Sequence, residues 1–278
     1  MDRASLLIEA LPYIRRFRGA VVVVKFGGNA LAGSEVAAFA EDMVLLHSVG
    51  IKPVVVHGGG PQIGELLERL GKQSEFRDGL RVTDADTLDV ARMVLVGKVN
   101  RDIVSAINVH GPLAVGLSGE DAKLITAAPH SVELGFVGRV LAVDPTILRR
   151  LLAEDLVPVV ATIGADESGQ AYNINADTVA GAIAESLDAE KLVFLSDVEG
   201  VRADPADPSS HLRRLTADRL SELLESGNAA GGMAPKAEAC VRAVRAGVRR
   251  AHILDGRAPH AIILELFTDG GIGTMVTP

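Results

Sequence analysis

Residues 21–30, Val-Val-Val-Val-Lys-Phe-Gly-Gly-Asn-Ala, join a run of four valines to a pair of glycines through a lysine. Four successive β-branched residues predict a strand that is buried on both faces, as in a parallel sheet. The glycines that follow permit a tight turn whose backbone N–H groups can approach a ligand. The stretch therefore predicts an α/β fold with a ligand site at the carboxyl end of this strand.

A second stretch of the same kind follows, in which an apolar run at residues 53–56 leads into His57-Gly58-Gly59-Gly60-Pro61. Proline suits the first turn of a helix, so Gly60 is expected at a helix N-terminus, where anions are favoured. Neither glycine turn has the P-loop sequence or the dinucleotide-binding spacing. Each turn alone is therefore also compatible with a plain connection between a strand and a helix.

Short apolar segments alternate with helical patterns along the whole chain, which predicts a three-layer α/β sandwich with a central, mostly parallel sheet. Residues 20–175 and 176–278 are expected to form two lobes that share this sheet, and residues 123–143 a β-hairpin. The other predicted strands are residues 113–117, 156–162, 191–196 and 251–254. The predicted helices are residues 35–49, 61–70, 83–108, 145–154, 176–187, 216–226 and 235–246.

The bulk composition excludes several classes of protein. The 278 residues are 48% apolar, contain no Trp, and carry a formal net charge of −8, which argues against nucleic acid as the main partner. The one cysteine, Cys240, cannot form an intramolecular disulfide and is expected in the core. Charged residues interrupt every long apolar run, so we expect neither a signal peptide nor a membrane span, and a cytoplasmic protein.

Four polar features stand out as candidate ligand-binding groups. Lys25 ends a buried strand beside glycines, and Lys236 lies in the first turn of a helix, where a lysine opposes the helix dipole. Arg81 lies among apolar residues and could clamp a carboxylate in a bidentate manner. The segment 173–177, Asn-Ile-Asn-Ala-Asp, opens a helix. Surface ion pairs and ordinary helix capping are the alternative interpretations of these residues.

The first helix, residues 2–18, places Leu6, Leu7, Ala10, Leu11, Ile14 and Phe17 on one stripe. Pro12 lies in its middle and predicts a kink. No strand precedes this helix, so its apolar stripe needs a covering partner.

Six motifs occur in order and span nearly the whole chain. They are KFGGNA at 25–30, VVVHGGGPQI at 54–63, DGLRVT at 78–83, NINAD at 173–177, SDVEGV at 196–201 and GGMAPK at 231–236. Together they resemble the amino acid kinase family, and within it the members that phosphorylate N-acetyl-L-glutamate and are inhibited by arginine. The resemblance implies the amino acid kinase fold.

The resemblance also implies an activity, namely transfer of the γ-phosphoryl group of ATP, with Mg²⁺, to the side-chain carboxylate of N-acetyl-L-glutamate in arginine biosynthesis. By motif, Lys25 and Lys236 contact the phosphates and Asp177 holds both lysines. The remaining expected contacts are Gly59, Gly60, Arg81 and Asn173 with the acceptor, and Gly27, Gly28, Ser196 and Asp197 with the nucleotide. The Mg²⁺ ion is expected to be carried on the ATP phosphates, without a cage of protein ligands.

For regulation, the resemblance implies that residues 1–19 form an N-terminal oligomerisation and regulatory helix, which builds a hexamer as a trimer of dimers. It also implies an L-arginine site that includes Tyr13, His252, Glu265 and Gly270. Three alternatives remain at this point. The chain could be a related kinase that acts on aminoadipate, glutamate or carbamate, or an arginine-sensing module without catalysis. A dinucleotide-dependent oxidoreductase is the most distant alternative, because the fingerprint turn is missing.

Overall fold

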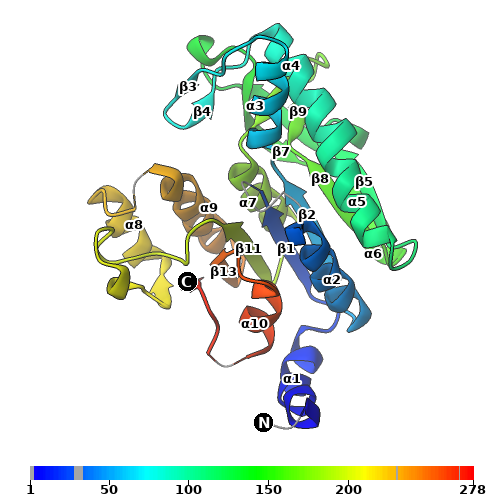
Figure 1. The fold of residues 1–278 in the computed structure, drawn as a ribbon, viewed down its shortest axis with the longest axis vertical. Helices are drawn as coiled ribbons and strands as arrows, with labels where there is room; N and C mark the ends of the chain where they lie inside the picture. The colour runs from blue at the N-terminus through cyan, green and yellow to red at the C-terminus, as the bar shows by residue number, and fades with distance from the viewer. Residues whose placement is uncertain (1–2, 28–33, 230, 269) are drawn as a thin grey trace.

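The computed structural model describes residues 3–27, 34–229, 231–268 and 270–278, and its centre is an eight-stranded sheet (Figure 1). The strand order is β12-β14-β13-β11-β1-β2-β8-β5, with β14 antiparallel to β13 and the other neighbours parallel. The predicted mostly parallel sheet is thus confirmed. Its strands are β1 (Val21–Phe26), β2 (Lys52–His57), β5 (Ala114–Ser118), β8 (Val157–Ala161), β11 (Lys191–Ser196), β12 (Arg214–Thr216), β13 (Arg250–Asp255) and β14 (Thr274–Thr277).

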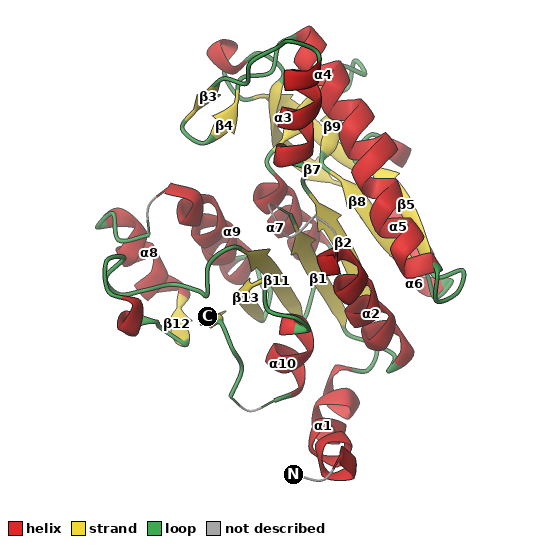
Figure 2. Ribbon diagram, in the orientation of Figure 1, coloured by secondary structure: helices red, strands yellow, loops and turns green. Residues whose placement is uncertain are grey.

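Helices cover both faces of this sheet, and each face has its own apolar core (Figure 2). One core contains residues of α2 (Ser34–Ser48), α3 (Gly60–Arg69), α4 (Ala85–Arg92), α5 (Asn100–Asn108) and α10 (Ala261–Phe267). The other contains residues of α6 (Thr146–Ala153), α7 (Ala176–Ser186), α8 (Ala217–Glu225) and α9 (Ala234–Arg245). This arrangement is the predicted three-layer sandwich.

The side chains of strand β1 point alternately into the two cores. Val22, Val24 and Phe26 belong to the core on the α2 side, whereas Val23 belongs to the core on the α7 side. Because successive side chains of a strand point to opposite faces, Lys25 shares the α7 face with Val23. The strand therefore delivers the lysine to one defined face at its carboxyl end.

A smaller β unit lies beyond β8 and is formed by strands that the sequence predicted only in part. The hairpin expected within residues 123–143 is confirmed as β6 (Ile125–Pro129) and β7 (Val137–Val143). It closes into a barrel with β9 (Ile163–Ala165) and β10 (Ala171–Ile174), which were not predicted. A two-stranded hairpin, β3 (Phe76–Arg77) and β4 (Leu80–Arg81), was also missed.

The helix predicted over residues 83–108 is interrupted by a change in helical winding. Residues Met93–Val99 form a π-helical segment between α4 and α5. π-Helical turns are rare in proteins, and those that occur often lie at functional sites. The π-helical segment packs against α3, which follows the second glycine turn.

The N-terminal helix, α1 (Arg3–Phe17), lies at one end of the molecule beside α10 (Figure 1). Phe17 is buried, and Tyr13 and Ile14 pack against the core, but Ile8 and Leu11 are 67% and 45% exposed. Part of the apolar stripe thus remains open to solvent. None of the described helices is long and apolar enough to cross a membrane.

Candidate active site

The two lysines that the sequence singled out meet at a single carboxylate. Lys25 Nζ lies 3.0 Å from Asp177 Oδ1, and Lys236 Nζ lies 3.1 Å from Asp177 Oδ2. Lys236 also donates to the Gly232 carbonyl at 3.1 Å. Lys25 and Asp177 are buried, with 8% and 5% of their surface exposed. The expectation that Asp177 holds both lysines therefore has direct geometric support.

Close packing of α7 on α9 explains how residues far apart in the chain meet. A Cβ added to Gly181 would lie 3.5 Å from the Ala239 Cβ, so small residues allow the two helices to approach. Asp177 is one turn before Gly181, and Lys236 is about one turn before Ala239. Asn175 caps α7 by accepting from the N–H groups of Asp177 and Thr178. The cap fixes the helix start, and with it the carboxylate of Asp177.

The charge state of this trio follows from its contacts. Burial alone would raise the pKa of Asp177, but the ammonium groups of Lys25 and Lys236 hold it below its ordinary value. The carboxylate is therefore ionised at neutral pH. One negative charge faces two positive ones, so the cluster carries a net positive charge that suits a phosphate group.

The two glycine turns adjoin this cluster. A Cβ on Gly27 would lie 3.1 Å from Lys25 Nζ and 3.6 Å from the Gly58 nitrogen, so the turns are close to each other and to the ammonium group. Gly28 lies outside the described residues. A Cβ on Gly59 would lie 2.8 Å from Leu95 Cδ2, so a larger residue would force the Leu95 side chain to shift. Gly60 begins α3, with Pro61 in its first turn, as the sequence predicted.

A cleft of about 1060 Å³ opens beside these residues. It is lined by the second glycine turn, by the β3–β4 hairpin and by residues 173–177, and Lys25 and Asp177 lie on its wall. Gly59, Gly60, Arg81 and Asn173, all predicted to bind the acceptor, line it together. The structure thus brings these four predicted residues to one cavity.

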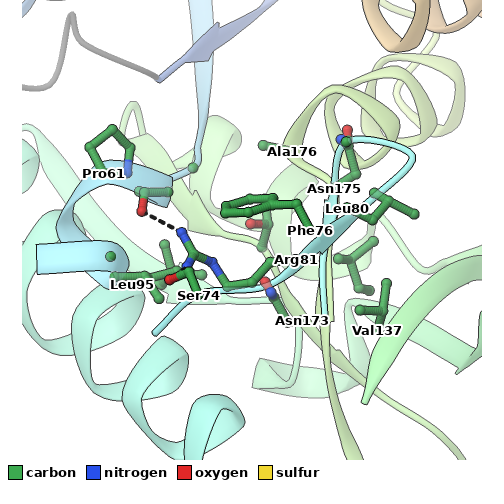
Figure 3. A pocket seen from close by; sticks show the side chains of 18 of the residues that line it. Pro61, Ser74, Phe76, Leu80, Arg81, Leu95, Val137, Asn173, Asn175 and Ala176 are labelled. Atoms are coloured by element: carbon green, nitrogen blue, oxygen red, sulfur yellow. Dashed lines mark hydrogen bonds between the residues drawn. The ribbon is translucent and has the colours of Figure 1, made fainter. Parts of the chain in front are cut away.

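Arg81 is the most distinctive polar group in the cleft (Figure 3). Its guanidinium lies 4.6 Å from the centre of the Phe76 ring, donates to the Gly60 carbonyl at 2.8 Å, and donates to Ser74 Oγ. Its side chain has no carboxylate within 4.0 Å among the described residues. Arg81 is only 9% exposed, and burial lowers its pKa. A buried cation without an anionic partner is well suited to bind a carboxylate ligand.

The remaining predicted contacts are more scattered. Asn173 Nδ2 donates weakly to Thr83 Oγ1 at 3.4 Å and stays on the cleft wall. Ser196 ends β11, which lies next to β1, so its hydroxyl is at the same edge of the sheet as Lys25. It donates to Asp197 Oδ1 at 3.2 Å. Neither Ser196 nor Asp197 lines the cleft itself.

A second cavity, of about 740 Å³, lies near the amino ends of β11 and β13. Tyr13, His252, Glu265 and Gly270, the four residues predicted for an arginine site, all line it. Cationic side chains also line this cavity, namely Arg16, Lys191, Arg213, Arg214 and Arg250. Glu265 carries the one carboxylate among the described residues that line this cavity. Such a cavity offers partners to both charges of an amino acid.

A hydrogen-bonded chain runs through this second cavity. Lys191 Nζ lies 2.9 Å from His252 Nε2, and His252 Nδ1 lies 2.7 Å from Glu265 Oε1. Burial lowers the pKa of His252 to about 4, so the ring is neutral and donates from Nδ1 to the carboxylate. Burial opposes the charge of Glu265, but that hydrogen bond and the N–H groups of Ile272 and Gly273 lower its pKa to about 2.

Sequence reasoning missed several of these residues. Lys191 begins the strand 191–196, whose next four residues are apolar, and a lysine in such a strand is a signal from which it could have been found. Ser74 and Phe76 support Arg81 from a short hairpin, and no periodic pattern marks them. Among the residues that the structure describes, no group of three or more His, Cys, Asp or Glu could hold a metal ion.

The sequence profile described as the amino acid kinase family matches residues 20–255. An acetylglutamate kinase of Symbiobacterium thermophilum is 54% identical, with coverage of 99% of this chain and 98% of the relative. One of Saccharopolyspora erythraea is 56% identical over 100% of this chain and 93% of the relative. A chloroplastic acetylglutamate kinase of Arabidopsis thaliana is 50% identical, with coverage of 99% and 80%.

Solved structures give the same result for the fold. The N-acetylglutamate synthase of Neisseria gonorrhoeae, complexed with coenzyme A and N-acetyl-glutamate, matches with a TM-score of 0.89 and 30% identity. The match covers 100% of this chain and 64% of that chain. A carbamate kinase from Giardia lamblia bound to AMP-PNP matches with a TM-score of 0.68 and 18% identity, over 93% of this chain and 98% of that chain. This second likeness concerns the fold alone.

Proposed function

Because the chain belongs to the amino acid kinase family, we propose that it transfers the γ-phosphoryl group of ATP to the side-chain carboxylate of N-acetyl-L-glutamate, in arginine biosynthesis. The product is an acyl phosphate. The observation that carries this proposal is the pairing of Lys25 and Lys236 with Asp177 beside a cleft lined by Arg81, which has no carboxylate partner among the described residues. Relatives that share half or more of its residues over nearly the whole chain support the choice of acceptor.

The acceptor needs no general base. A side-chain carboxylate has a pKa near 4.3 and is already an ionised nucleophile at neutral pH. The difficulty is electrostatic, because this anion must approach a polyphosphate. We assign Lys25 and Lys236 to the transferred phosphoryl group, where their charge offsets the negative charge of the transition state. Asp177 fixes the two ammonium groups in place.

The two ends of the acceptor are recognised by different groups. Arg81, which has no carboxylate partner among the described residues, binds the α-carboxylate, and Asn173 lies on the same wall of the cleft. The N–H groups of Gly59 and Gly60 bind the reacting end at the start of α3, where the helix dipole favours an anion. Binding at both ends aligns the nucleophile with the phosphoryl group, which is the main task in this chemistry.

The nucleotide is assigned to the edge of the sheet formed by the carboxyl ends of β1 and β11. Gly27 and Gly28 bind its phosphates, and Ser196 and Asp197 lie along it. We propose that Mg²⁺ reaches the site on the ATP phosphates, where it reduces their negative charge. Residues 20–175 then form the acceptor lobe and residues 176–278 the nucleotide lobe. The cytoplasmic location predicted from the sequence is kept as part of this proposal.

The experiment that tests this function is trapping of the acyl phosphate with hydroxylamine. We expect ATP-dependent hydroxamate formation with N-acetyl-L-glutamate, and much less with glutamate or N-acetyl-aminoadipate. Exchange of Arg81 for Leu should raise the KM for the acceptor more than the KM for ATP. Equal rates with glutamate and N-acetyl-L-glutamate would contradict the proposed substrate.

We also propose that the second cavity binds L-arginine as a feedback inhibitor. Its cationic lining suits the α-carboxylate of arginine, and the ionised Glu265 suits the guanidinium. Tyr13 comes from α1, so this site connects the N-terminal helix to the body of the protein. Inhibition of hydroxamate formation by L-arginine, but not by D-arginine, is the expected result.

The exposed part of α1 is assigned to an interface between copies of the chain. Ile8 and Leu11 are large apolar side chains that water surrounds in the single chain. Packing of two such helices from neighbouring dimers would cover them and would build a hexamer as a trimer of dimers. Light scattering of the full chain tests this assembly.

A further inference from the structure

His57 is a buried histidine for which the proposed phosphoryl transfer has no use. It ends β2, directly before the glycines of the cleft, and is 0% exposed. Val55 and His57 share the face of the sheet that packs against α5, opposite to the face of Lys25. The ring does not line the cleft. Its partners are Asn100, the first residue of α5, and the carbonyl of Gly58.

The hydrogen bonds of Asn100 determine which nitrogen of the His57 ring carries the proton. Asn100 Nδ2 lies 2.8 Å from the Val159 carbonyl, which only accepts, so this atom is the amide nitrogen. The same nitrogen lies 3.0 Å from His57 Nε2 and 3.4 Å from the Leu117 carbonyl, and its second hydrogen goes to Nε2, the nearer of these two acceptors. Nε2 therefore carries no proton. His57 Nδ1 lies 3.0 Å from the Gly58 carbonyl and must be the donor of that bond.

The other oxygen and nitrogen atoms of this group are consistent with that assignment. Asn100 Oδ1 accepts from the Arg101 guanidinium, so the amide cannot be reversed without placing donors against a donor. Burial lowers the pKa of His57 to about 4, which keeps the ring neutral at physiological pH. A neutral ring with the proton on Nδ1 is the one state that satisfies all of these contacts.

We propose that His57 is a positioning residue, which holds the peptide between Gly58 and Gly59 so that the Gly59 N–H faces the cleft. A trans peptide is planar, with its C=O and N–H groups on opposite sides. If His57 holds the Gly58 carbonyl on the α5 side, the Gly59 N–H must point the other way. This inference rests on the proposed function, in which that N–H binds the reacting end of the acceptor.

The peptide between Gly58 and Gly59 needs a contact that fixes its orientation, because it is flanked by two glycines. A Cβ at residue 59 would lie 2.8 Å from Leu95 Cδ2 and 3.2 Å from Val99 Cγ2, so a larger residue would force these side chains of the π-helical segment to shift. A peptide flanked by two glycines can rotate at little steric cost. After rotation, the Gly58 carbonyl would face the incoming anion and repel it. The bond from His57 makes the productive orientation the stable one, since rotation would leave a buried donor without an acceptor.

The tautomer can be measured without any assay of activity. The full-length protein is labelled with ¹⁵N-histidine, and the His57 ring signals are identified by their loss in His57→Asn. We expect a neutral Nδ1–H tautomer that does not titrate between pH 5.5 and 8. An Nε2–H tautomer, or titration near the ordinary pKa of about 6.5, would overturn the proposal. This result stands even if N-acetyl-L-glutamate is not the substrate.

Kinetics then test the effect on catalysis. His57→Leu, which fills the space but cannot donate, is expected to lower kcat by roughly tenfold or more, with a smaller change in the KM for ATP. His57→Asn keeps an N–H donor near the Nδ1 position and is expected to recover most of that loss. Equal kcat values for His57→Leu and the wild type would overturn the proposal.

A matched control separates positioning from simple loss of stability. Ile107→Ala removes a fully buried side chain on the same helix as Asn100, two turns away, and should lower the melting temperature. It should leave kcat at 25 °C near the wild-type value. If Ile107→Ala and His57→Leu lower kcat equally, the role of His57 is structural only. If the wild type turns over none of the tested acceptors, the proposed substrate fails, and the tautomer measurement alone decides the inference.

Discussion

Lys25 and Asp177 form a buried ion pair with 3.0 Å between Nζ and Oδ1, across the junction of β1 and α7. The second oxygen of the same carboxylate binds Lys236. Burial of a charge is costly unless partners compensate it, and here one anion compensates two cations only in part. We therefore propose that a further anion completes the cluster, namely the transferred phosphoryl group that the proposed reaction brings to it.

Removal of either lysine tests this relationship. Lys25→Ala and Lys236→Ala are each expected to lower kcat by on the order of 10² or more, because each removes a positive charge that stabilises the transition state. Hydroxamate formation at saturating ATP and N-acetyl-L-glutamate is the measurement. Lys98→Ala is the control, since Lys98 is exposed and pairs with Asp102 on the surface. A loss smaller than about tenfold in both variants would contradict the assigned role.

The arginine site gives a second prediction, which concerns regulation. Glu265→Gln is expected to raise the L-arginine concentration for half-maximal inhibition by about tenfold or more, because a neutral amide binds a guanidinium without the charge-assisted bonds. Dose–response curves at fixed substrate concentrations measure this shift. Glu222→Gln, an exposed substitution on α8, is the matched control. Identical curves for Glu265→Gln and the wild type would remove Glu265 from the site.

The N-terminal helix gives a third prediction, on assembly. Ile8→Glu with Leu11→Glu places two charges on the exposed part of α1 and should reduce the proposed hexamer to dimers, as should deletion of residues 1–19. The double variant is the sharper test, because Tyr13 and Phe17 stay in place and keep the second cavity intact. Val132→Glu, at a residue that is 99% exposed, is the control. A double variant that remains hexameric in light scattering would contradict the interface.

Much of this site was accessible from the sequence, because its residues lie at the ends of regular elements. The alternation of β1 assigns Lys25 to one face, and Pro61 marks the start of α3. The contact between Asp177 and Lys236 is different in kind. The two residues are 59 positions apart, and nothing local requires them to meet. That contact was expected only through the resemblance of the motifs to a known family.

Other features could not be predicted because their determinants are tertiary. The π-helical segment Met93–Val99 has the same apolar composition as an ordinary helix turn, so its wider winding leaves no periodic signature. Helix α10 was missed because all of its seven residues except Glu265 are apolar, so the segment shows no helical alternation of apolar and polar residues. The role of His57 depends on Asn100, which lies in a helix whose sequence shows nothing unusual. Buried polar pairs of this kind become visible only when the fold is known.

Buried neutral histidines give a fourth prediction, on the pH dependence of stability. Burial lowers the pKa of His57 to about 4, below the value of about 6.5 expected in the unfolded chain. Between these values the unfolded state binds more protons than the folded state, so this contribution to stability is lost as the pH falls. His57→Asn lacks this effect. The difference in free energy of unfolding between the wild type and His57→Asn should therefore shrink by about 2 kcal/mol from pH 7 to pH 5.

Denaturant titrations of both proteins at several pH values measure this difference. The comparison cancels the contribution of Asp42, whose pKa burial raises to about 6 and which acts in the opposite direction. It also cancels that of His252, which is present in both proteins. Curves that stay parallel between pH 7 and pH 5 would show that His57 is protonated in the folded protein, or accessible to water.

The loop between β5 and β6 gives a fifth prediction, on backbone strain. Ala122 has φ 52° and ψ 27°, in the left-handed region, where its Cβ costs about 1–2 kcal/mol. Glycine removes that cost but adds entropy to the unfolded chain, worth about 0.4–1 kcal/mol. Ala122→Gly is therefore expected to stabilise the protein by up to roughly 1 kcal/mol, measured as a higher midpoint of thermal unfolding. The control is Ala153→Gly at the end of α6, where the same exchange in a helical conformation should lower the midpoint. If both exchanges lower the midpoint equally, Ala122 carries no backbone strain. A strained alanine would instead gain stability when glycine replaces it.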